Sequence, residues 1–301
     1  AKKVSSKGDT YLDLVFMDAK GEISSKLWDY KEEAHSWIQP NMIVKVRGAE
    51  EIWNEKKQFR LQRIRRVCPE DRFRLSDLVP CAPYEGEDLF ETILQITDSF
   101  SDEGLLTRYK EKIIVCPAAV KLHHAVCSGL LYHTLSVVRL AQAACGVYPF
   151  LDSDLLLSGA ILHDISKIDE LKVEETGIAS GYTPRGQLLG HLVMGAMEIE
   201  AAGTRLGVDP ERLLLLEHML ISHHGVPEFG SAVRPMCLEA QVLAALDDLD
   251  AKVNQISCAV SQVEKGGFSE KMWALDQRRF YNFNGLEVPK ADILNQKEET
   301  I

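Results

Sequence analysis

The chain has 301 residues, 46% of them hydrophobic, and a formal net charge of −11. This length suits two domains of ordinary size, and the apolar share is ample for hydrophobic cores. No apolar run approaches the roughly 18–20 residues that cross a bilayer, and the N-terminus lacks a hydrophobic signal segment, so we expect a soluble, cytoplasmic protein with no membrane partner. Seven scattered cysteines without a CxxC pair argue against a disulfide framework or a zinc ribbon.

The charge is divided unevenly along the chain. Residues 1–75 carry 16 Lys and Arg against 12 Asp and Glu, a net +4, whereas the remainder carries 18 against 33, a net −15. A basic module joined to an acidic one suggests that the first part grips any polyanion. The second part must then offset its own charge locally, for instance with metal ions.

The basic part has the pattern of a small β-barrel. Alternating apolar residues predict strands, and the order strand, strand, helix, strand, strand resembles the nucleic-acid-binding type of OB-fold. Only KKVSS precedes the first hairpin, so we expect the first strand to be partly missing or the numbering to begin inside a longer chain. The predicted strands cover 11–18, 21–29, 40–53 and 57–67, the helix covers 31–38, the domain covers 1–75, and a proline-containing linker covers 76–89.

OB-folds bind single strands by stacking bases on aromatic side chains, at about 1–3 kcal/mol per base, while basic residues follow the phosphates. Alternatively, about half of the candidate aromatic residues named below form the barrel core, and the charged residues around them form a solvated face. The candidates are Trp28, Tyr30, Trp53 and Phe59, with Lys26, Lys45, Arg47, Lys56, Lys57 and Arg60 around them.

The acidic part is predicted to be helical almost to its end, which makes the whole chain a multidomain protein with an all-β and an all-α part. We place the helical domain over 90–285 and an irregular tail over 286–301. The predicted helices cover 87–100, 104–114, 129–144, 152–168, 186–203, 210–225 and 238–264.

Eight of the nine histidines lie between residues 123 and 224, and six of them lie on four separate predicted helices with apolar neighbours. A single imidazole on an apolar face is usually a satisfied core residue, but burying several beside carboxylates costs several kcal/mol unless a partner compensates them. Divalent transition metals need such imidazoles and carboxylates, and supply the missing charge. The candidates are His133, His163, Asp164, His191, His223, His224, Asp247 and Asp250.

His163 and Asp164 are neighbours, so on a helix their side chains point about 100° apart. One can therefore bind a first ion while the other, with two oxygens, bridges to a second. Lys167 follows His163 by four residues and would bring a cation to the rim of the site; the alternative is a surface lysine at a helix end.

The order H, HD, H, HH, D on successive helices resembles the HD-domain superfamily of metal-dependent phosphohydrolases, in its HDxxK variant. The chain is similar, from about residue 9 to 285, to the bacterial YhaM-like 3'-5' exoribonucleases, which join an N-terminal OB-fold to an HD domain. The segments that carry the resemblance are PAAVKLHHAVCSGLLYHTLSV, LLLSGAILHDISKIDEL, GQLLGHLVMGA, LISHHGVPEFGSAVRP and ALDDLDAKV.

The resemblance implies two groups of ligands that share Asp164. The resemblance implies that Asp247, and not Asp250, is a metal ligand, because the first aspartate of a D-x-x-D-A ending is the ligand in the family.

The chain departs from the family at Tyr132, where an acidic residue is common, and at Ser128–Gly129, where the family has two glycines. These departures could alter the number of metal ions or the fit of the substrate. His123 and His124 would touch a substrate phosphate or else cap and pack a helix. By position, one ion would be held by His133, His163, Asp164 and Asp247. The other ion would be held by Asp164, His191, His223 and His224.

The chemistry implied is phosphoester hydrolysis by a hydroxide that two ions generate, with Asp164 bridging the ions and Lys167 meeting the developing charge. The family favours manganese; iron, cobalt, zinc and nickel stay open. Because an OB-fold is of use on a polymer, the expected activity is a 3'-to-5' exonuclease that converts single-stranded RNA, and DNA as an open alternative, to nucleoside monophosphates. The rivals are a phosphodiesterase or phosphatase for a nucleotide or other small phosphoester, a di-iron oxygenase and a non-enzymatic nucleic-acid binder. Assembly into a homo-oligomer stays open.

Overall fold

The computed structural model describes residues 1–5, 8–18, 21–53, 56–97, 103–121, 124–287 and 291–294. The chain divides into two compact units, one formed by residues 1–81 with 174–178 and the other by 82–173 with 179–301. The boundaries expected from sequence differ slightly from this division and stay predictions. Within the described ranges, no helix is both long enough and apolar enough to cross a bilayer.

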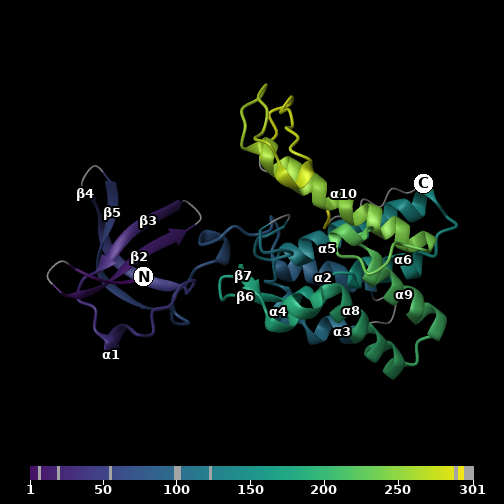
Figure 1. The fold of residues 1–301 in the computed structure, drawn as a ribbon, viewed down its shortest axis with the longest axis horizontal. Helices are drawn as coiled ribbons and strands as arrows, with labels where there is room; N and C mark the ends of the chain where they lie inside the picture. The colour runs from purple at the N-terminus through teal and green to yellow at the C-terminus, as the bar shows by residue number, and fades with distance from the viewer. Residues whose placement is uncertain are drawn as a thin grey trace. The chain divides into compact units, whose positions relative to one another are not determined.

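The N-terminal unit is built on a five-stranded sheet with the strand order β1-β2-β3-β5-β4 (Figure 1). Neighbouring strands are antiparallel except β3 and β5, which pair in parallel. This arrangement, with one short helix between β3 and β4, fits the partly open five-stranded barrel of the OB-fold, so the predicted fold is confirmed. The elements are β1 (Lys2–Val4), β2 (Thr10–Asp18), β3 (Gly21–Leu27), α1 (Glu32–His35), β4 (Val44–Trp53) and β5 (Lys56–Arg66).

The first strand, which we expected to be incomplete, is three residues long and pairs with β2. Across the sheet, the buried Ser25 hydroxyl donates to the backbone oxygen of Phe59 at 2.7 Å, which ties β3 to β5. A Cβ atom at Gly48 would meet the Phe59 ring at 2.7 Å, so this glycine leaves room for the ring. Phe59 also contacts Phe16 edge-on, with 6.0 Å between ring centroids, and both side chains are half-buried.

The second unit is helical, as predicted, but contains one hairpin that the sequence did not predict, formed by β6 (Leu171–Val173) and β7 (Ala179–Tyr182). Its strands are too short to show a clear alternating pattern. The predicted helix over 104–114 is two helices that meet at Tyr109, and the one over 152–168 is interrupted after Leu162. The helices are α2 (Gly86–Thr97), α3 (Glu103–Arg108), α4 (Lys110–Ile113), α5 (Gly129–Val147), α6 (Ser153–Leu162), α7 (Lys167–Glu170), α8 (Pro184–Leu206), α9 (Pro210–Ser222) and α10 (Leu238–Ser261).

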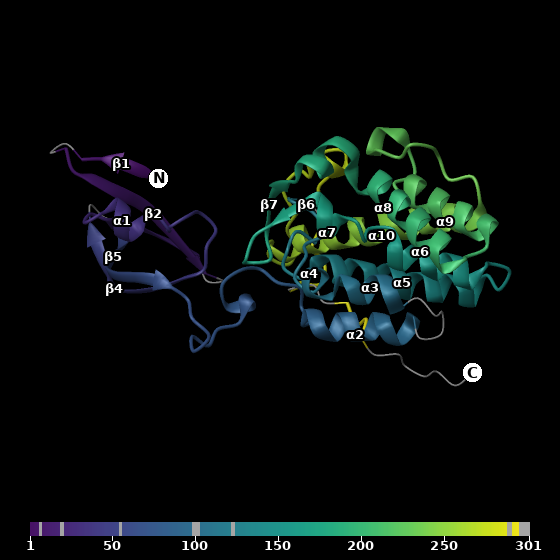
Figure 2. The same cartoon turned by 90° about the horizontal axis from the view of Figure 1, so that it is seen from below.

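Helix α5 lies at the centre of the helical unit and packs against α2, α6 and α10 (Figures 1 and 2). Residues 129–138 are all buried, because the first half of this helix is apolar on every side. His133 is therefore fully enclosed, at 0% exposure. An imidazole in that position must find its partners inside the unit.

Three other helices end or break where the sequence places a histidine. Helix α6 ends at His163, and α9 ends at His223, two residues before Gly225, which takes the left-handed conformation with φ 80°. Helix α8 is interrupted at Gly190, with φ 72° and ψ 158°, directly before His191. The residues nearest these breaks lie outside a regular helical ladder, which lets their side chains turn toward one centre.

We predict opposite effects for two substitutions in α5. In Gly129→Ala the new Cβ would meet the His124 backbone oxygen at 2.0 Å, so the backbone must move, and we expect the free energy of unfolding to fall by about 1–3 kcal/mol. In Gly146→Ala the new Cβ meets nothing within 4 Å. Because alanine has the better helix propensity, we expect the free energy of unfolding to rise by about 0.5–1 kcal/mol. Urea unfolding followed by circular dichroism checks both values; equal midpoints for the two variants would contradict the packing described.

Candidate metal centre

The structure brings all seven predicted metal ligands together in the helical unit. They come from five helices or helix ends that are far apart in the sequence. His133 lies on α5, His163 and Asp164 at the end of α6, His191 on α8, His223 and His224 at the end of α9, and Asp247 on α10.

The first group of ligand atoms lies between α5, α6 and α10. His133 Nε2 is 3.2 Å from His163 Nε2 and 3.1 Å from an Asp247 oxygen. His163 Nε2 is 3.4 Å from Asp164 Oδ2. Two atoms that bind one ion at about 2.0–2.2 Å lie about 2.8–3.6 Å apart at octahedral or tetrahedral angles. These separations therefore match those of ligands around a single ion.

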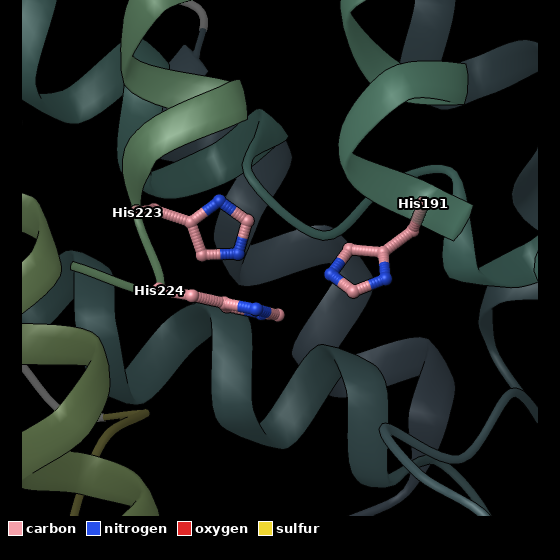
Figure 3. A group of neighbouring side chains, drawn as sticks. All are labelled: His191, His223 and His224. Carbon is pink, nitrogen blue, oxygen red and sulfur yellow. The ribbon is translucent and has the colours of Figure 1, made fainter. Parts of the chain in front are cut away.

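The second group lies on the other side of Asp164. Asp164 Oδ1 is 3.2 Å from His191 Nε2 and 3.6 Å from His223 Nε2. Figure 3 shows His191, His223 and His224 turned toward one another, and the ligand atoms of these three lie within 4.8 Å of each other. Asp164 thus offers one oxygen to each group, which is the geometry of a bridging carboxylate.

All five imidazoles present the same nitrogen to this centre. In each ring Nδ1 faces an oxygen acceptor, so Nδ1 carries the proton and Nε2 is left with a lone pair. Metal-binding histidines are held in this way, with the second ring nitrogen donating to a carbonyl or carboxylate. The acceptors are the backbone oxygens of Ala160, Leu220 and Phe229 for His163, His223 and His224, and the carboxylates of Asp250 and Glu170 for His133 and His191, at 2.7–3.1 Å.

Three atoms of the centre are buried without a hydrogen-bond partner among the described residues: Asp164 Oδ1, His191 Nε2 and His223 Nε2. A buried polar atom left in this state costs about 1–3 kcal/mol. Burial also lowers the pKa of His223 to about 4, so its Nε2 stays a lone pair at neutral pH. Three converging acceptors with no donor are what a cation would satisfy, and the donor set of imidazole and carboxylate fits a divalent ion.

The charges of the cluster lead to the same conclusion. Burial opposes charge on Asp164, but Lys167 and His163 hold its pKa well below the usual value, and the pKa values of Asp247, Asp250 and Glu170 are lowered as well. Lys167 supplies one positive charge. Four carboxylates and one ammonium leave three negative charges in the cluster, which bound divalent ions would offset.

Lys167 is buried beside the metal ligands and is not the surface lysine of the alternative interpretation. Its Nζ lies 2.6 Å from Asp164 Oδ2, the oxygen that faces the first group. Burial alone would lower the lysine pKa, but the neighbouring Asp164 raises it, so the ammonium stays charged. Asp164 and Lys167, the aspartate and lysine of the HDxxK motif, therefore form an ion pair.

Asp250 and Asp247 contact different nitrogens of the His133 ring. One oxygen of Asp250 accepts from His133 Nδ1 at 2.7 Å and from His124 Nε2 at 2.8 Å, on the far side of the His133 ring. This geometry favours Asp247 as the ligand and Asp250 as the residue that orients His133. His124 is buried with its ring engaged there, whereas His123 lies outside the described residues.

Glu170 is a site residue that the sequence reasoning missed. The break at Gly190 frees the backbone N–H of His191, which donates to Glu170 Oε1 at 3.0 Å, and His191 Nδ1 donates to the same oxygen at 3.1 Å. In the sequence Glu170 looks like part of a charged helix end, KIDEL. The one signal available was a glycine inside a helical pattern directly before a histidine, which often marks a kink.

Tyr132, the departure from the family pattern, does not face the metal ligands through its hydroxyl. That oxygen accepts from the backbone N–H of Ala291 at 2.9 Å, and the Tyr84 hydroxyl donates to the Ala291 backbone oxygen at 3.0 Å. Both tyrosines therefore fasten the segment 291–294 to the helical unit. The neighbouring Ile293 is buried at 5% exposure.

The predicted nucleic-acid-binding residues of the strand-rich unit differ in how exposed their side chains are. Trp28 is 57% exposed, its ring lies 4.6 Å from that of Tyr11, and Lys26 Nζ lies 5.1 Å from its centroid. Arg47 and Arg60 are also exposed. Phe59 is half-buried against Phe16, and its role as a stacking surface stays a prediction. The Trp53 side chain lies outside what the structure describes.

We predict that Glu170→Ala weakens divalent-metal binding about 10–100-fold, because His191 loses the acceptor that orients it. Glu170→Gln keeps one oxygen acceptor and should lose less. The neighbouring Asp169→Asn removes a charge that is paired with Lys112 instead, and serves as the control. Competition with a coloured chelator measures the affinity; equal affinities for Glu170→Ala and Asp169→Asn would refute the positioning role.

Comparisons with known proteins agree with this geometry. The HD domain family model matches residues 130–252. The chain is 39% identical over 287 residues to the 3'-5' exoribonuclease YhaM of Geobacillus sp. (strain WCH70), covering 93% of this chain and 88% of that protein. It is 36% identical over 287 residues to the 3'-5' exoribonuclease YhaM of Bacillus subtilis (strain 168), covering 93% and 90%.

Among solved structures, the HD domain of the L. monocytogenes phosphodiesterase PgpH aligns with a TM-score of 0.34 and 18% identity, over 50% of this chain and 74% of that one, too low a similarity to compare the two sites. The two YhaM proteins, by contrast, match this chain over nearly all of its length and theirs. The convergent histidines and aspartates, the HD match and these relatives together place the chain in the YhaM family of 3'-5' exoribonucleases.

Proposed function

We propose that this protein is a metal-dependent 3'-to-5' exonuclease that hydrolyses single-stranded RNA to nucleoside monophosphates. The observation that carries the proposal is Asp164, whose two oxygens face two separate groups of imidazole nitrogens. The relatives named above, which are called 3'-5' exoribonucleases, support the choice of reaction.

We propose two ions per chain, with Asp164 between them. Ligand sets of imidazole and carboxylate without thiolate suit manganese, which the family resemblance favours, and leave iron, cobalt, zinc and nickel as outcomes of metal analysis. When bound, such ions polarise a phosphoryl group and lower the pKa of water. The first set is His133, His163, Asp164 and Asp247, and the second is Asp164, His191, His223 and His224.

The protein residues contribute position and charge. Lys167, fixed beside Asp164, holds an ammonium close to where a phosphoryl group would gain negative charge, and needs no reorganisation to do so. Asp250 and Glu170 keep His133 and His191 in the tautomer that presents Nε2. The surrounding aliphatic helices strengthen these interactions by excluding water.

The strand-rich unit favours a polymer over a mononucleotide as substrate. An exposed Trp28 beside Lys26, with Arg47 and Arg60 on the same unit, provides an aromatic surface and cations suited to a single strand. A small-nucleotide phosphatase has little use for such a surface.

The proposal is tested by incubating the protein and Mn²⁺ with 5'-labelled single-stranded RNA that ends in a 3'-hydroxyl or a 3'-phosphate. We expect a ladder that shortens one nucleotide at a time from the free 3' end, a delay on the blocked RNA, and no products with EDTA. Parallel arms contain single-stranded DNA, a cyclic dinucleotide and mononucleotides. Hydrolysis of mononucleotides alone, with the RNA intact, would favour the small-phosphoester alternative and contradict the exonuclease.

Aspartate variants in α10 and at Asp164 should separate ligands from positioning residues. We expect Asp164→Asn and Asp247→Asn to lower kcat/KM on RNA by more than about 100-fold, and Asp250→Asn by about 10–100-fold, as is usual for a residue that orients a ligand. Asp248→Asn, exposed and paired with Lys252 at 2.5 Å, should change it little. Initial rates with excess Mn²⁺ give the comparison, and an Asp250→Asn defect larger than that of Asp247→Asn would reverse the assignment.

A further inference from the structure

A groove of about 340 Å³ in the helical unit is lined by α8, from Met194 to Arg205 and at Arg185, and by residues of neighbouring segments. Three arginines from different segments line it, Arg108 at the end of α3 and Arg185 and Arg205 near the two ends of α8. All three are exposed. Figure 2 shows α7 and α8 close together, and the two helices pack against each other.

The arginines have no ion-pair partner within the described ranges, although the part of the chain after residue 75 has 33 acidic residues against 18 basic ones. Two acids also line the groove. Asp169 pairs with Lys112 at 2.8 Å, whereas Glu198 accepts hydrogen bonds from the neutral hydroxyls of Tyr109 and, at 3.5 Å, Ser166. Three arginines against one carboxylate without a cationic partner leave the groove with a net positive charge in an acidic unit, the condition that attracts an anion.

The groove lies next to the candidate metal centre. Ser166, which lines it, stands in the sequence between Asp164 and Lys167, and Met194 follows His191 by one helical turn. From Met194 to Arg205 the helix advances eleven residues, or about 16 Å. The groove thus extends from the neighbourhood of the metal ligands along α8, farther than one phosphate group reaches.

We propose that this groove holds the sugar-phosphate backbone of the RNA strand on the 5' side of the terminal nucleotide, with the arginines on successive phosphates. The inference rests on the proposed function and adds to it a path for the substrate. Met197, which also lines the groove, is 52% exposed and gives ribose or base an apolar surface to pack on. Guanidinium groups suit this task because they pair bidentately with phosphate oxygens.

The test replaces all three arginines with glutamine (R108Q/R185Q/R205Q) in the full chain. Arg212→Gln on α9, exposed and paired with Asp152 at 2.8 Å, is the matched control. Fluorescence anisotropy of a labelled 12-nucleotide RNA in EDTA measures binding at several salt concentrations. Since each contact with a single strand contributes about 0.7 to the slope of log K against log[salt], we expect the triple variant to lose about 2 from that slope and the control to lose nothing.

With Mn²⁺, the triple variant should raise the KM for the 12-nucleotide RNA at least 10-fold relative to its KM for a dinucleotide, which is too short to follow the groove. A triple lysine variant (R108K/R185K/R205K) should recover most of the salt slope, which separates loss of charge from loss of structure.

An unchanged salt slope and KM in the triple glutamine variant would overturn the inference. It would also be overturned if AMP or inorganic phosphate bound the wild type and not the variant while RNA binding stayed equal, because the groove would then serve a small ligand. Failure of the proposed function has a different signature: the wild type leaves RNA intact with Mn²⁺, while the binding arm in EDTA still reports on the groove.

Discussion

The helical unit depends on how one buried carboxylate is neutralised. Asp164 is 1% exposed and lies among imidazoles, each of which has already used its Nδ1 proton. Lys167 compensates one oxygen, but the other faces only nitrogen lone pairs. Such an arrangement is costly for a protein without a bound cation, and becomes favourable when an ion converts those lone pairs into ligands. The rest of the unit is arranged around that requirement.

The fold meets the requirement by placing helix ends, rather than helix middles, at the centre. His163 and His223 cap their helices, so their Nδ1 groups reach the backbone oxygens of Ala160 and Leu220 three residues earlier. The break at Gly190 gives His191 a free N–H that Glu170 captures. Only His133 sits inside a regular helix, and it relies on a carboxylate, that of Asp250. Each device fixes a ring before any ion arrives, which is the preorganisation that a tight site needs.

Much of this could be read from the sequence, because it rests on residue type and periodicity. Alternation gave the strands, the 3.6-residue period gave the helices, and the repeated appearance of histidine on apolar helices pointed to a shared centre. The features that the sequence did not predict depend on contacts between residues that are far apart in the chain. Phe59 and Trp28 are both aromatic residues of strand-rich segments, and only the structure shows that Phe59 is half-buried beside Gly48 whereas Trp28 is 57% exposed. Glu170 and Asp250 are ordinary acids in the sequence, and their contacts with His191 and His133 come from chain segments that the pattern does not connect.

Bound cations, and not protonated side chains alone, are expected to neutralise the cluster around Asp164. The most direct measurement is a calorimetric Mn²⁺ titration of chelator-stripped protein, compared with the same titration of Asp164→Ala. We expect two ions per wild-type chain and loss of both high-affinity sites in the variant, since the one carboxylate serves both groups. A wild-type chain that binds no divalent ion, or a variant that binds as many as the wild type, would contradict this expectation.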